Sequence, residues 1–430
     1  MKYGIKTLDD FEFKGKTVLA RLDLNSPYDK DSGRFKDITR IKAALPTIVE
    51  LLEAGAKLTI LTHQGGDLEY HNYISTELHS KEIARLTGEN VAFIDDVCGP
   101  AARDAVKKLA PGRMLLLDNV RYMAEEMTLF ETKLKLNSRD QAKTLVVRKL
   151  APLADIYICD AFAAAHRDQP TLVGFEELLP SGMGRLFENE YEVLSKIMED
   201  PQHPAVFLLG GAKIEDAFNM MPEVLSKGIA TTILSAGLLG QLFLIAGGAS
   251  LGKASEGVIY AKKLDEYMDQ AKSLLRRYAD RIMTPIDFAY IDGGRKEIKL
   301  SALPLDHVIS DIGSGTIVKY KDVISGAKTV FINGPAGVFE KFETENGTKE
   351  LFTHIVATEV LSVIGGGDSI SAANKFVPRN SFSYMCTGGG AMVRFLSGEE
   401  LPVVKALKKD SKNENKYSVW KRENITEDTR

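Results

Sequence analysis

The 430-residue chain has few cysteines and no excess of charge of either sign. Its three cysteines, Cys98, Cys159 and Cys386, are widely spaced and none belongs to a CxxC pair. This spacing argues against a disulfide framework or a structural zinc and is typical of a reducing compartment. With 55 Lys and Arg against 59 Asp and Glu, the chain offers no overall charge for binding nucleic acid or an anionic membrane. Any basic site must therefore be local.

The chain also lacks the usual patterns of secretion and membrane insertion. Residues 1–17 carry charges every few positions, where a signal peptide would need an apolar run. One uncharged stretch of 25 residues, 228–252, is long enough to span a bilayer, but it contains six glycines and a glutamine and has no aromatic belt. We predict a buried strand followed by a buried helix in this stretch, and a cytoplasmic protein.

Short apolar runs alternate with longer amphipathic stretches along most of the chain. In 38–55 the apolar residues recur at helical spacing, and Gly55 is a plausible end of that helix. Alternation of strands and helices indicates parallel sheets covered by helices. The predicted fold class is therefore α/β, with two Rossmann-like domains joined by a helical hinge. We expect strands at 16–25, 57–63, 90–95, 113–120 and 155–162, and then at 204–211, 230–237, 281–291, 328–337 and 362–369.

Composition also suggests where the domains end. Residues 174–204 are rich in helix formers and bounded by prolines, and the chain becomes polar after about Leu407. We expect an N-terminal domain at 1–175, a connector at 176–203, a second domain at 204–400 and a tail at 401–430. A return of this tail to the N-terminal domain is one option.

Polar and basic residues follow the expected strands of the first half. Ligands of open α/β sheets bind beyond the carboxyl ends of the strands, and arginine recognises phosphate and carboxylate groups through two parallel hydrogen bonds. Five such loops in one domain indicate a site for a small anion that carries both groups. For any single arginine, an ordinary surface or packing role is an equal alternative. The residues concerned are Arg21, Asp23, Asn25, Arg40, His63, Arg121, His166 and Arg167.

Glycine-rich loops follow the expected strands of the second half. Glycine lets backbone N–H groups approach an anion closely, and the N-terminus of a helix adds its dipole. A single glycine pair is more often a simple turn, but six such loops predict a bound polyphosphate nucleotide. The loops lie at 208–213, 235–240, 311–316, 333–340, 365–369 and 386–391.

Three side chains in these loops are candidates for nucleotide chemistry. Asp368 follows three glycines, so we expect it at the start of a helix as an oxygen ligand of Mg²⁺, with an N-cap as the compatible alternative. Lys213 is expected to neutralise a transferring phosphoryl group, unless it is merely solvated. Glu340 is a candidate acceptor for ribose hydroxyls. The near match to a phosphate-binding loop at 247–254 is set aside, because Ala254 replaces the Mg²⁺-binding hydroxyl.

Nine motifs in order make the chain, from about residue 5 to 405, resemble phosphoglycerate kinase, most closely its archaeal branch. They are RLDLNSP, ITRIKAALPTI, THQGG, LLDNVRY, CDAFAAAHR, LLGGAKIEDA, INGPAGVFE, IGGGDS and CTGGGA. The resemblance implies a cytosolic glycolytic and gluconeogenic enzyme of two domains that uses Mg²⁺. Its reaction would transfer a phosphoryl group reversibly between ATP and the carboxylate of 3-phosphoglycerate, in line, after the domains close.

The resemblance also implies a role for each site residue. Arg40 and Lys213 are the implied catalytic residues, which bracket the transferring group from different domains. No general base is required, because a carboxylate is already nucleophilic, and a monomer is expected. The implied phosphoglycerate ligands are Asp23, Asn25, Arg40, His63, Arg121 and Arg167. The implied Mg-nucleotide ligands are Gly211, Lys213, Gly237, Asn333, Glu340, Gly366, Gly367, Asp368 and Ser369, with Asp368 on the metal.

Two positions depart from the family pattern. Gly66 stands where the family usually has an arginine that helps hold the 3-phosphate, and Ala217 replaces a second lysine of many members. Two alternatives therefore stay open. One is a paralogous kinase that makes an acyl phosphate on a different phosphorylated carboxylic acid, and the other is a non-catalytic nucleotide-binding homologue. Base preference, flux direction and the role of 408–430 are left open as well.

Overall fold

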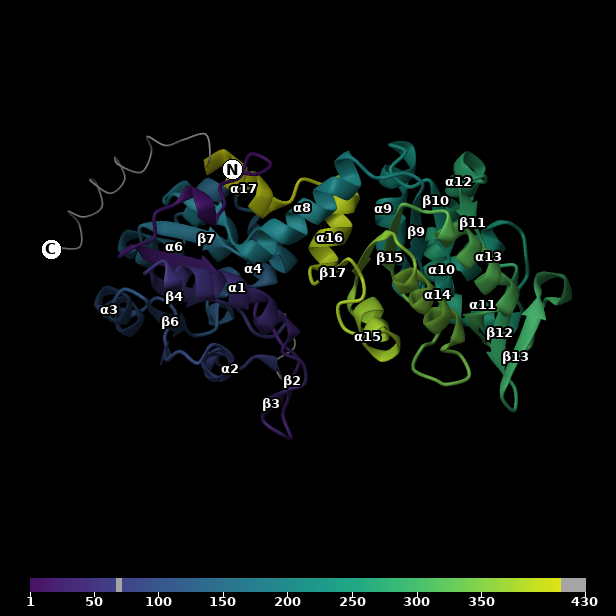
Figure 1. Cartoon of the computed structure of the whole chain (residues 1–430), viewed down its shortest axis with the longest axis horizontal. Coiled ribbons are helices and arrows are strands. Elements are labelled where there is room, and N and C mark those ends of the chain that lie inside the picture. The colour runs from purple at the N-terminus through teal and green to yellow at the C-terminus, as the bar shows by residue number, and fades with distance from the viewer. Residues whose placement is uncertain (67–71, 411–430) are drawn as a thin grey trace. The chain divides into compact units, whose positions relative to one another are not determined.

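The computed structural model describes residues 1–66 and 72–410, and the chain divides into two compact units. Of the described residues, unit 1 comprises those of Met1–Glu192 and of 400–410, and unit 2 comprises Val193–Glu399. Each unit contains its own six-stranded sheet, in which every pair of neighbouring strands is parallel (Figure 1). The predicted α/β class with two parallel sheets is confirmed.

The sheet of unit 1 has the strand order β5-β6-β4-β1-β7-β8. Its strands are β1 (Thr17–Arg21), β4 (Lys57–Leu61), β5 (Val91–Ile94), β6 (Arg113–Leu117), β7 (Ile156–Cys159) and β8 (Ser181–Met183), and β2 (Tyr28–Asp29) pairs with β3 (Arg34–Phe35) in a separate hairpin. The helices are α1 (Thr39–Glu53), α2 (Glu77–Thr87), α3 (Pro100–Lys108), α4 (Thr128–Leu134), α5 (Ser138–Gln141), α6 (Leu145–Leu150) and α7 (Pro170–Val173). Helix α1 buries Ile41, Ala44, Ile48 and Leu51 against β1, β4 and β6. This apolar stripe at helical spacing is why the sequence forms a helix that covers the sheet.

The sheet of unit 2 has the order β11-β10-β9-β15-β16-β17. Its strands are β9 (Ala205–Leu209), β10 (Thr232–Ser235), β11 (Ile282–Met283), β15 (Thr329–Asn333), β16 (Leu361–Gly365) and β17 (Tyr384–Cys386). The helices are α9 (Ile214–Ser226), α10 (Gly237–Ala246), α11 (Lys253–Ala261), α12 (Met268–Tyr278), α13 (Ser314–Ser325), α14 (Asn346–Ala357), α15 (Gly367–Phe376) and α16 (Gly389–Leu396). The largest fully buried side chains of one core layer, Tyr320 of α13 and Phe352 of α14, pack on β9, β10, β15 and β16.

The expected strand at 281–291 is wrong in its extent. The chain instead forms β11, which pairs with β10, and then β12 (Asp287–Ile291) in a different sheet. Pro285 lies between them and has no backbone N–H to continue a ladder. In this second sheet β12 lies antiparallel between β13 (Arg295–Lys299) and β14 (Ile309–Ile312), and the sequence analysis did not anticipate this arrangement.

The uncharged stretch 228–252 forms a buried strand, β10, and then the helix α10, as predicted. Among the helices of the described residues, none combines the length and the apolar character that crossing a bilayer requires. The glycines of this stretch act at the ends of the elements. Gly237 begins α10 with a φ of +54°, and Gly247 follows its last turn.

The chain passes from unit 1 to unit 2 within α8 (Arg185–Glu199), a helix inside the predicted connector 176–203. The start of α8 is held in unit 1 by two groups. The buried carboxylate of Asp160 accepts the backbone N–H of Phe187 at 2.9 Å, and the Arg185 guanidinium donates to both carboxylate oxygens of Glu50 in α1, at 2.8 and 2.6 Å. The first turns of α8 are therefore fixed to the same sheet edge and helix that carry the candidate site of unit 1.

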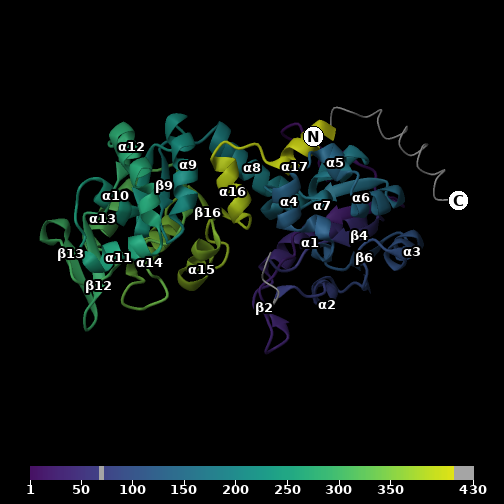
Figure 2. The same cartoon turned by 180° about the vertical axis from the view of Figure 1, so that it is seen from behind.

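The last described helix, α17 (Pro402–Asp410), belongs to unit 1 and lies beside α7 (Figure 2). The N–H of Val403 donates to the carbonyl of Ala165 at 3.3 Å, and the ammonium group of Lys409 contacts the carboxylate of Glu177. Val403 and Leu407 are fully buried. The remainder of the predicted tail, 411–430, lies outside the described residues.

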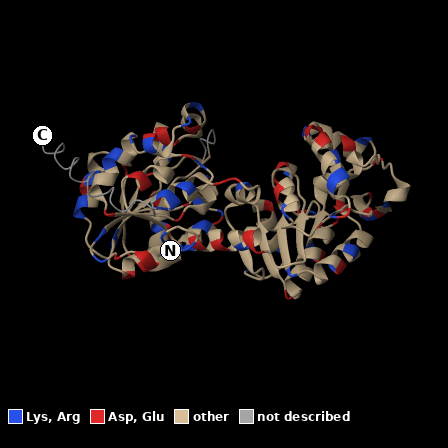
Figure 3. Ribbon diagram, turned by 90° about the horizontal axis from the view of Figure 1, so that it is seen from above, with Lys and Arg blue, Asp and Glu red and all other residues tan. Residues whose placement is uncertain are grey.

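Lys and Arg are interspersed with Asp and Glu along the helices of each unit rather than gathered by sign (Figure 3). Pairs four residues apart, such as Lys81 with Glu77 and Lys108 with Asp104, join opposite charges on one helix face at 2.8 and 2.6 Å. A binding site for an anion must then depend on particular side chains rather than on the overall field of a unit.

Candidate active site

The carboxyl ends of β6, β4, β1 and β7 lie next to one another in the sheet of unit 1. Each of these strands is followed by residues that the sequence analysis selected. Asp23 and Asn25 follow β1, His63 follows β4, Arg121 follows β6 and Arg167 follows β7. The strand order therefore brings these loops to one edge, which is where ligands of parallel sheets bind.

Asp23 and Arg40 form a partly buried pair at this edge. Arg40 lies in the first turn of α1, and its Nη1 donates to the two carboxylate oxygens of Asp23 at 3.1 and 3.0 Å. Burial alone would raise the pKa of Asp23, but the charge of Arg40, together with other basic neighbours, lowers it to about 2. Asp23 is therefore ionised at neutral pH and fixes the position of the Arg40 guanidinium, which is still about a third exposed, at 36% of its side chain.

His63 is a neutral hydrogen-bond donor in the same loop cluster. Nη2 of Arg21 lies 3.2 Å from Nδ1 of His63, and because an arginine can only donate, Nδ1 must be the acceptor. Burial lowers the pKa of His63 well below its ordinary value. The proton of the neutral ring is consequently on Nε2, which can donate to a phosphate or carboxylate oxygen. Arg21 itself is fully buried, and its Nε donates a hydrogen bond to Oγ1 of Thr171. It therefore holds His63 from the interior of unit 1.

Asn25 and Arg121 shape the loop that carries Gly66. The Oδ1 of Asn25 accepts the N–H of Gly65 at 3.0 Å, and Arg121 donates to the carbonyl of Gly65. Gly65 has a φ of +88°, and a Cβ there would lie 2.8 Å from the carbonyl oxygen of Asn72, so only glycine fits. Both predicted ligands therefore act on the loop backbone, and residues 67–71 beyond Gly66 lie outside the described residues.

Arg167 contacts a different neighbour, helix α4. Its Nη1 donates to Oγ1 of Thr128 at 2.7 Å and lies 3.8 Å from a carboxylate oxygen of Glu131. The guanidinium is about one quarter exposed, at 28% of the side chain. Arg167 is therefore a positive group held by α4 at the end of the β7 loop.

Unit 2 has a cavity of about 140 Å³ where its central strands end. The strand order β10-β9-β15-β16 brings the glycine loops together there. Most of the predicted nucleotide ligands line it, and Asp216, Gly334, Gly389 and Gly390 were not among the predicted ligands. The predicted residues that line it are Gly211, Lys213, Asn333, Gly366, Gly367, Asp368 and Ser369.

Two glycines are required by the packing of these loops. Gly366 has a φ of +89°, and a Cβ there would lie 2.6 Å from Oδ1 of Asn333. Gly237 has a φ of +54°, and its Cβ would lie 2.7 Å from the backbone nitrogen of Gly211. Ser369 joins two loops, because its Oγ accepts the N–H of Gly334 at 2.7 Å. The loops are thus in contact along their backbones, which leaves N–H groups near the cavity.

Lys213 and Asp368 are the two exposed charges of this cavity that the sequence analysis singled out. Among the described residues, neither has a hydrogen-bond or ion-pair partner. Lys213 directly precedes α9, and Asp368 lies in the first turn of α15. The N-cap of α15 is Gly366, so the alternative role of Asp368 as an N-cap is wrong. Both side chains are free to contact a ligand.

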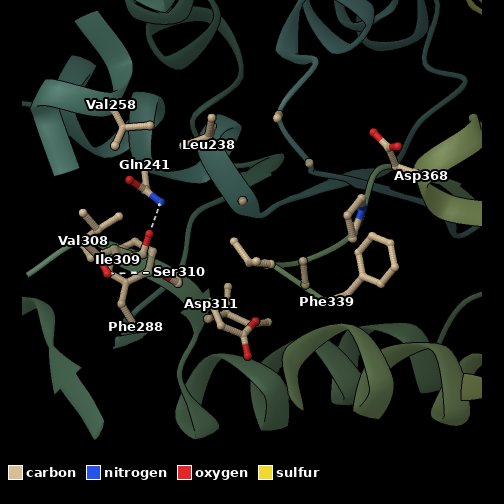
Figure 4. A pocket seen from close by; sticks show the side chains of 18 of the residues that line it. Leu238, Gln241, Val258, Phe288, Val308, Ile309, Ser310, Asp311, Phe339 and Asp368 are labelled. Carbon is tan, nitrogen blue, oxygen red and sulfur yellow. Dashed lines mark hydrogen bonds between the residues drawn. The ribbon is translucent and has the colours of Figure 1, made fainter. Parts of the chain in front are cut away.

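A second, larger cavity of about 320 Å³ continues from the first and shares Gly211, Ala212 and Asp368 with it. Gly237 and Glu340, both predicted nucleotide ligands, line this cavity rather than the smaller one. Asp368 stands at one end, and Gln241 and Val258 stand at the other (Figure 4). Its walls are largely apolar, with Leu238, Val258, Phe288, Val308, Ile309, Ile312, Pro335, Val338 and Phe339. An apolar cavity that opens into a glycine-lined one has the form of a nucleoside polyphosphate site.

A network around Arg295 supports one wall of this cavity. Nη1 of Arg295 donates to Asp311 of β14 at 2.8 Å and to the carbonyl of Glu343 at 3.1 Å. Burial raises the pKa of Asp311 to about 6, although Arg295 opposes this effect. The network ties the loop that follows Glu340 to the small antiparallel sheet, so it helps to position Glu340.

Residues 8–399 match the family model described as phosphoglycerate kinase. The chain belongs to the phosphoglycerate kinase family. The phosphoglycerate kinase of Methanothermus fervidus is 40% identical and aligns over 96% of this chain and 98% of the relative. That of Thermococcus kodakarensis is 44% identical, over 93% of this chain and 96% of the relative.

Solved structures of the same family have the same fold. The crystal structure of phosphoglycerate kinase from Pyrococcus horikoshii superposes with a TM-score of 0.85 at 39% identity and covers 94% of this chain and 99% of that chain. The structure from Coxiella burnetii gives 0.79 at 28% identity, with the same coverage of both chains. The prediction of a phosphoglycerate kinase, an ATP-dependent kinase of glycolysis, is confirmed, as is its likeness to archaeal members.

Proposed function

We propose that this phosphoglycerate kinase family member binds 3-phosphoglycerate at the sheet edge of unit 1 and MgATP in the two cavities of unit 2. Transfer then requires the units to close so that the two ligands meet. The protein would act as a monomer in the cytoplasm. The observation that carries the proposal is the pair of contiguous cavities, one glycine-lined and one apolar, at the strand ends of unit 2. The second alternative, a homologue that only binds nucleotide, would not need Arg40, Lys213 and Asp368 together.

The residues of unit 1 position an anionic acceptor. Arg40, Arg121 and Arg167 supply positive charge, and Nε2–H of His63 supplies an uncharged donor. The carboxylate of the acceptor attacks the terminal phosphorus without a base, because it is already ionised at neutral pH. Catalysis therefore reduces to alignment and charge neutralisation. Arg40 and Lys213 neutralise the charge that is spread over the transferring group, each from its own unit.

Asp368 fits a Mg²⁺ ion that is bound mainly by nucleotide phosphates. Such an ion prefers oxygen ligands and keeps several waters, with only one or two carboxylates from the protein. Within residues 1–66 and 72–410, no three His, Cys, Asp or Glu side chains converge on a possible metal site. A phosphate-bound Mg²⁺ needs only one protein carboxylate, and Asp368 is a single exposed carboxylate beside the glycine-lined cavity. When bound, the ion would neutralise phosphate charge.

The proposed acceptor is tested by incubating the protein with MgATP and 3-phosphoglycerate and trapping the acyl phosphate with hydroxylamine. We expect a hydroxamate that depends on 3-phosphoglycerate and does not form with glycerate, which lacks the phosphate. Because Gly66 replaces the usual arginine, a panel of other phosphorylated carboxylic acids is run in parallel. A hydroxamate from one of those acids, with none from 3-phosphoglycerate, would show that the paralogous kinase is the correct alternative.

We expect Asp368→Asn to weaken the use of MgATP selectively. Loss of a group that supports a bound metal typically costs roughly 10–100-fold in metal affinity or activity, and asparagine keeps the size of the side chain but not its charge. The measurement is a Mg²⁺ titration of the rate at fixed ATP, with calorimetry of ADP in the absence of the metal. The exposed Asp322 on α13, replaced in the same way, is the control and should behave as the wild type.

A further inference from the structure

One uncharged polar side chain is buried in the wall of the larger cavity. Gln241 lies in α10, is 3% exposed, and lines the cavity together with Val258 and Phe288. Helix α10 is apolar on almost every side, and burying an amide in such a helix is costly unless its hydrogen bonds are made. Among the described residues, only one of these bonds is made, from Nε2 to the carbonyl of Ile309 at 3.3 Å.

The amide of Gln241 therefore has two groups left for a ligand. An amide nitrogen carries two hydrogens, and the Ile309 carbonyl takes one of them. In the part of the chain that the structure describes, no group donates to Oε1 of Gln241. Two other polar groups of this cavity have partners within the protein, since Ser310 donates to the carbonyl of Val308 at 3.2 Å and Oδ2 of Asp311 accepts from Arg295 at 2.8 Å. Lys262 also lines the cavity, and its ammonium group, as a donor without an acceptor, does not match the paired donor and acceptor of a purine edge.

Gln241 stands where a purine base would lie. In the proposed function, on which this inference rests, the phosphates occupy the glycine-lined cavity beside Asp368. Asp368 and Gln241 are at opposite ends of the larger cavity (Figure 4). A nucleotide that extends away from Asp368 therefore directs its base toward Gln241, between apolar walls that suit a flat ring.

We propose that Gln241 reads the base and makes this enzyme prefer ATP to GTP. The Watson–Crick edge of adenine has a donor, the N6 amine, next to an acceptor, N1. Oε1 and the second Nε2 hydrogen of Gln241 match this pair, just as a glutamine amide matches the N6 donor and N7 acceptor on the other edge of adenine in DNA. Guanine has the opposite pair, with O6 as the acceptor and N1–H as the donor.

The Ile309 carbonyl is what makes the reading selective. A free glutamine could turn its amide by half a rotation and pair with either purine. Here Nε2 must remain toward the Ile309 oxygen, because turning the amide would place Oε1 against that carbonyl. The orientation that suits adenine is therefore fixed in advance, and guanine meets acceptor against acceptor and donor against donor.

The test is the ratio of kcat/KM for ATP, GTP and ITP, with the acceptor held at saturation. We expect the wild type to favour ATP over both other nucleotides by about tenfold or more, as the loss of one or two hydrogen bonds would give. ITP shares O6 and N1–H with GTP but lacks the 2-amino group. ITP should therefore behave like GTP. If ITP behaves like ATP, the cavity merely excludes the 2-amino group and the proposal is wrong.

Two variants of Gln241 separate reading from packing. Gln241→Met keeps the length of the side chain and removes both hydrogen bonds, so kcat/KM should fall about tenfold for ATP and little for GTP and ITP. Gln241→Glu accepts but cannot donate, so it should shift the ratio toward GTP, whose N1–H and N2–H both donate. Val258→Ala, at the same end of the cavity, is the matched control and should lower kcat/KM for all three nucleotides in parallel.

The outcomes also distinguish this inference from the proposed function. If Gln241→Met lowers kcat/KM equally for ATP and GTP, while thermal unfolding shows a folded protein, base recognition by Gln241 is rejected and the kinase assignment stands. If the wild type turns over no nucleotide with any phosphorylated acid, or if nucleotide binding is unaffected by both Asp368→Asn and Val258→Ala, the placement of the nucleotide itself is wrong.

Discussion

Replacing Arg40 by alanine is expected to lower kcat about a thousandfold or more, the contribution of a charge-stabilising arginine in phosphoryl transfer. The affinity for ATP should change little, because the proposed nucleotide ligands all belong to unit 2. Arg40 is suited to this role because Asp23 holds the guanidinium by two contacts at 3.0 and 3.1 Å while a third of the side chain remains exposed. Steady-state kinetics and calorimetry of ADP give the two quantities.

Two further variants serve as controls for this result. Asp23 is buried and loses its partner in Arg40→Ala, so Arg40→Lys is included to keep a positive charge near it. Arg34, an exposed arginine of β3 in the same unit, is replaced by alanine as the control and should leave kcat unchanged. An equal loss of kcat and of ATP affinity in Arg40→Ala would contradict the proposed role.

Asp160→Asn is expected to change the pH dependence of stability strongly between pH 5 and pH 8. Burial raises the pKa of Asp160 to about 7, against 3.8 for the ordinary side chain, and the nearby Glu190 adds to this effect. The protonated form is therefore favoured by folding. This contribution to stability is complete below pH 3.8 and is lost as the pH rises through 7.

The size of the effect follows from the same pKa. Since one pKa unit corresponds to about 1.4 kcal/mol, the wild type should lose about 3 kcal/mol relative to Asp160→Asn between pH 5 and pH 8. Urea unfolding at the two pH values measures this difference. Asp104→Asn, at an exposed position of α3, is the control and should track the wild type. If the free energies of unfolding of Asp160→Asn and the wild type differ by the same amount at both pH values, Asp160 does not titrate in this range.

The buried histidines change stability with pH in the opposite direction. For this reason the wild type must be compared with Asp160→Asn at each pH. Burial lowers the pKa of His79 to about 4, and that of His63 also lies well below the ordinary value of 6.5. Folding favours their neutral forms, so stability falls as the pH drops below 6.5. The stability of the wild type alone would combine these effects, whereas the difference between the wild type and Asp160→Asn isolates one carboxyl group.

The features of the site that were predictable from sequence are those that depend on local backbone demands. Three glycines before Asp368 predicted a tight turn into a helix, and the structure places Gly366 at a φ of +89° with Asp368 in the first turn of α15. Likewise, apolar runs that end in polar residues predicted strands whose ends meet at one edge. Both inferences need only a few consecutive residues.

The features that were missed depend on residues far apart in the sequence. Gln241 belongs to a stretch interpreted only as a buried strand and helix, and its interest arises from the carbonyl of Ile309, 68 residues away. Arg295 reaches Asp311 and Glu343 across a sheet that was not predicted, because β12 to β14 are short and one of them is half exposed. No spacing rule in a single sequence marks such pairs.

The position of α17 has a consequence for the order in which the protein is made on the ribosome. Unit 2 is formed by one continuous segment, Val193–Glu399, so all of it has been synthesised before the segment that forms α17 emerges. Unit 1 begins at the first residue yet needs Val403 and Leu407 to complete its surface around Ala165. Of the two units, the one that is begun first is therefore completed last, and its helix α7 has to wait for its final neighbour until unit 2 has been translated.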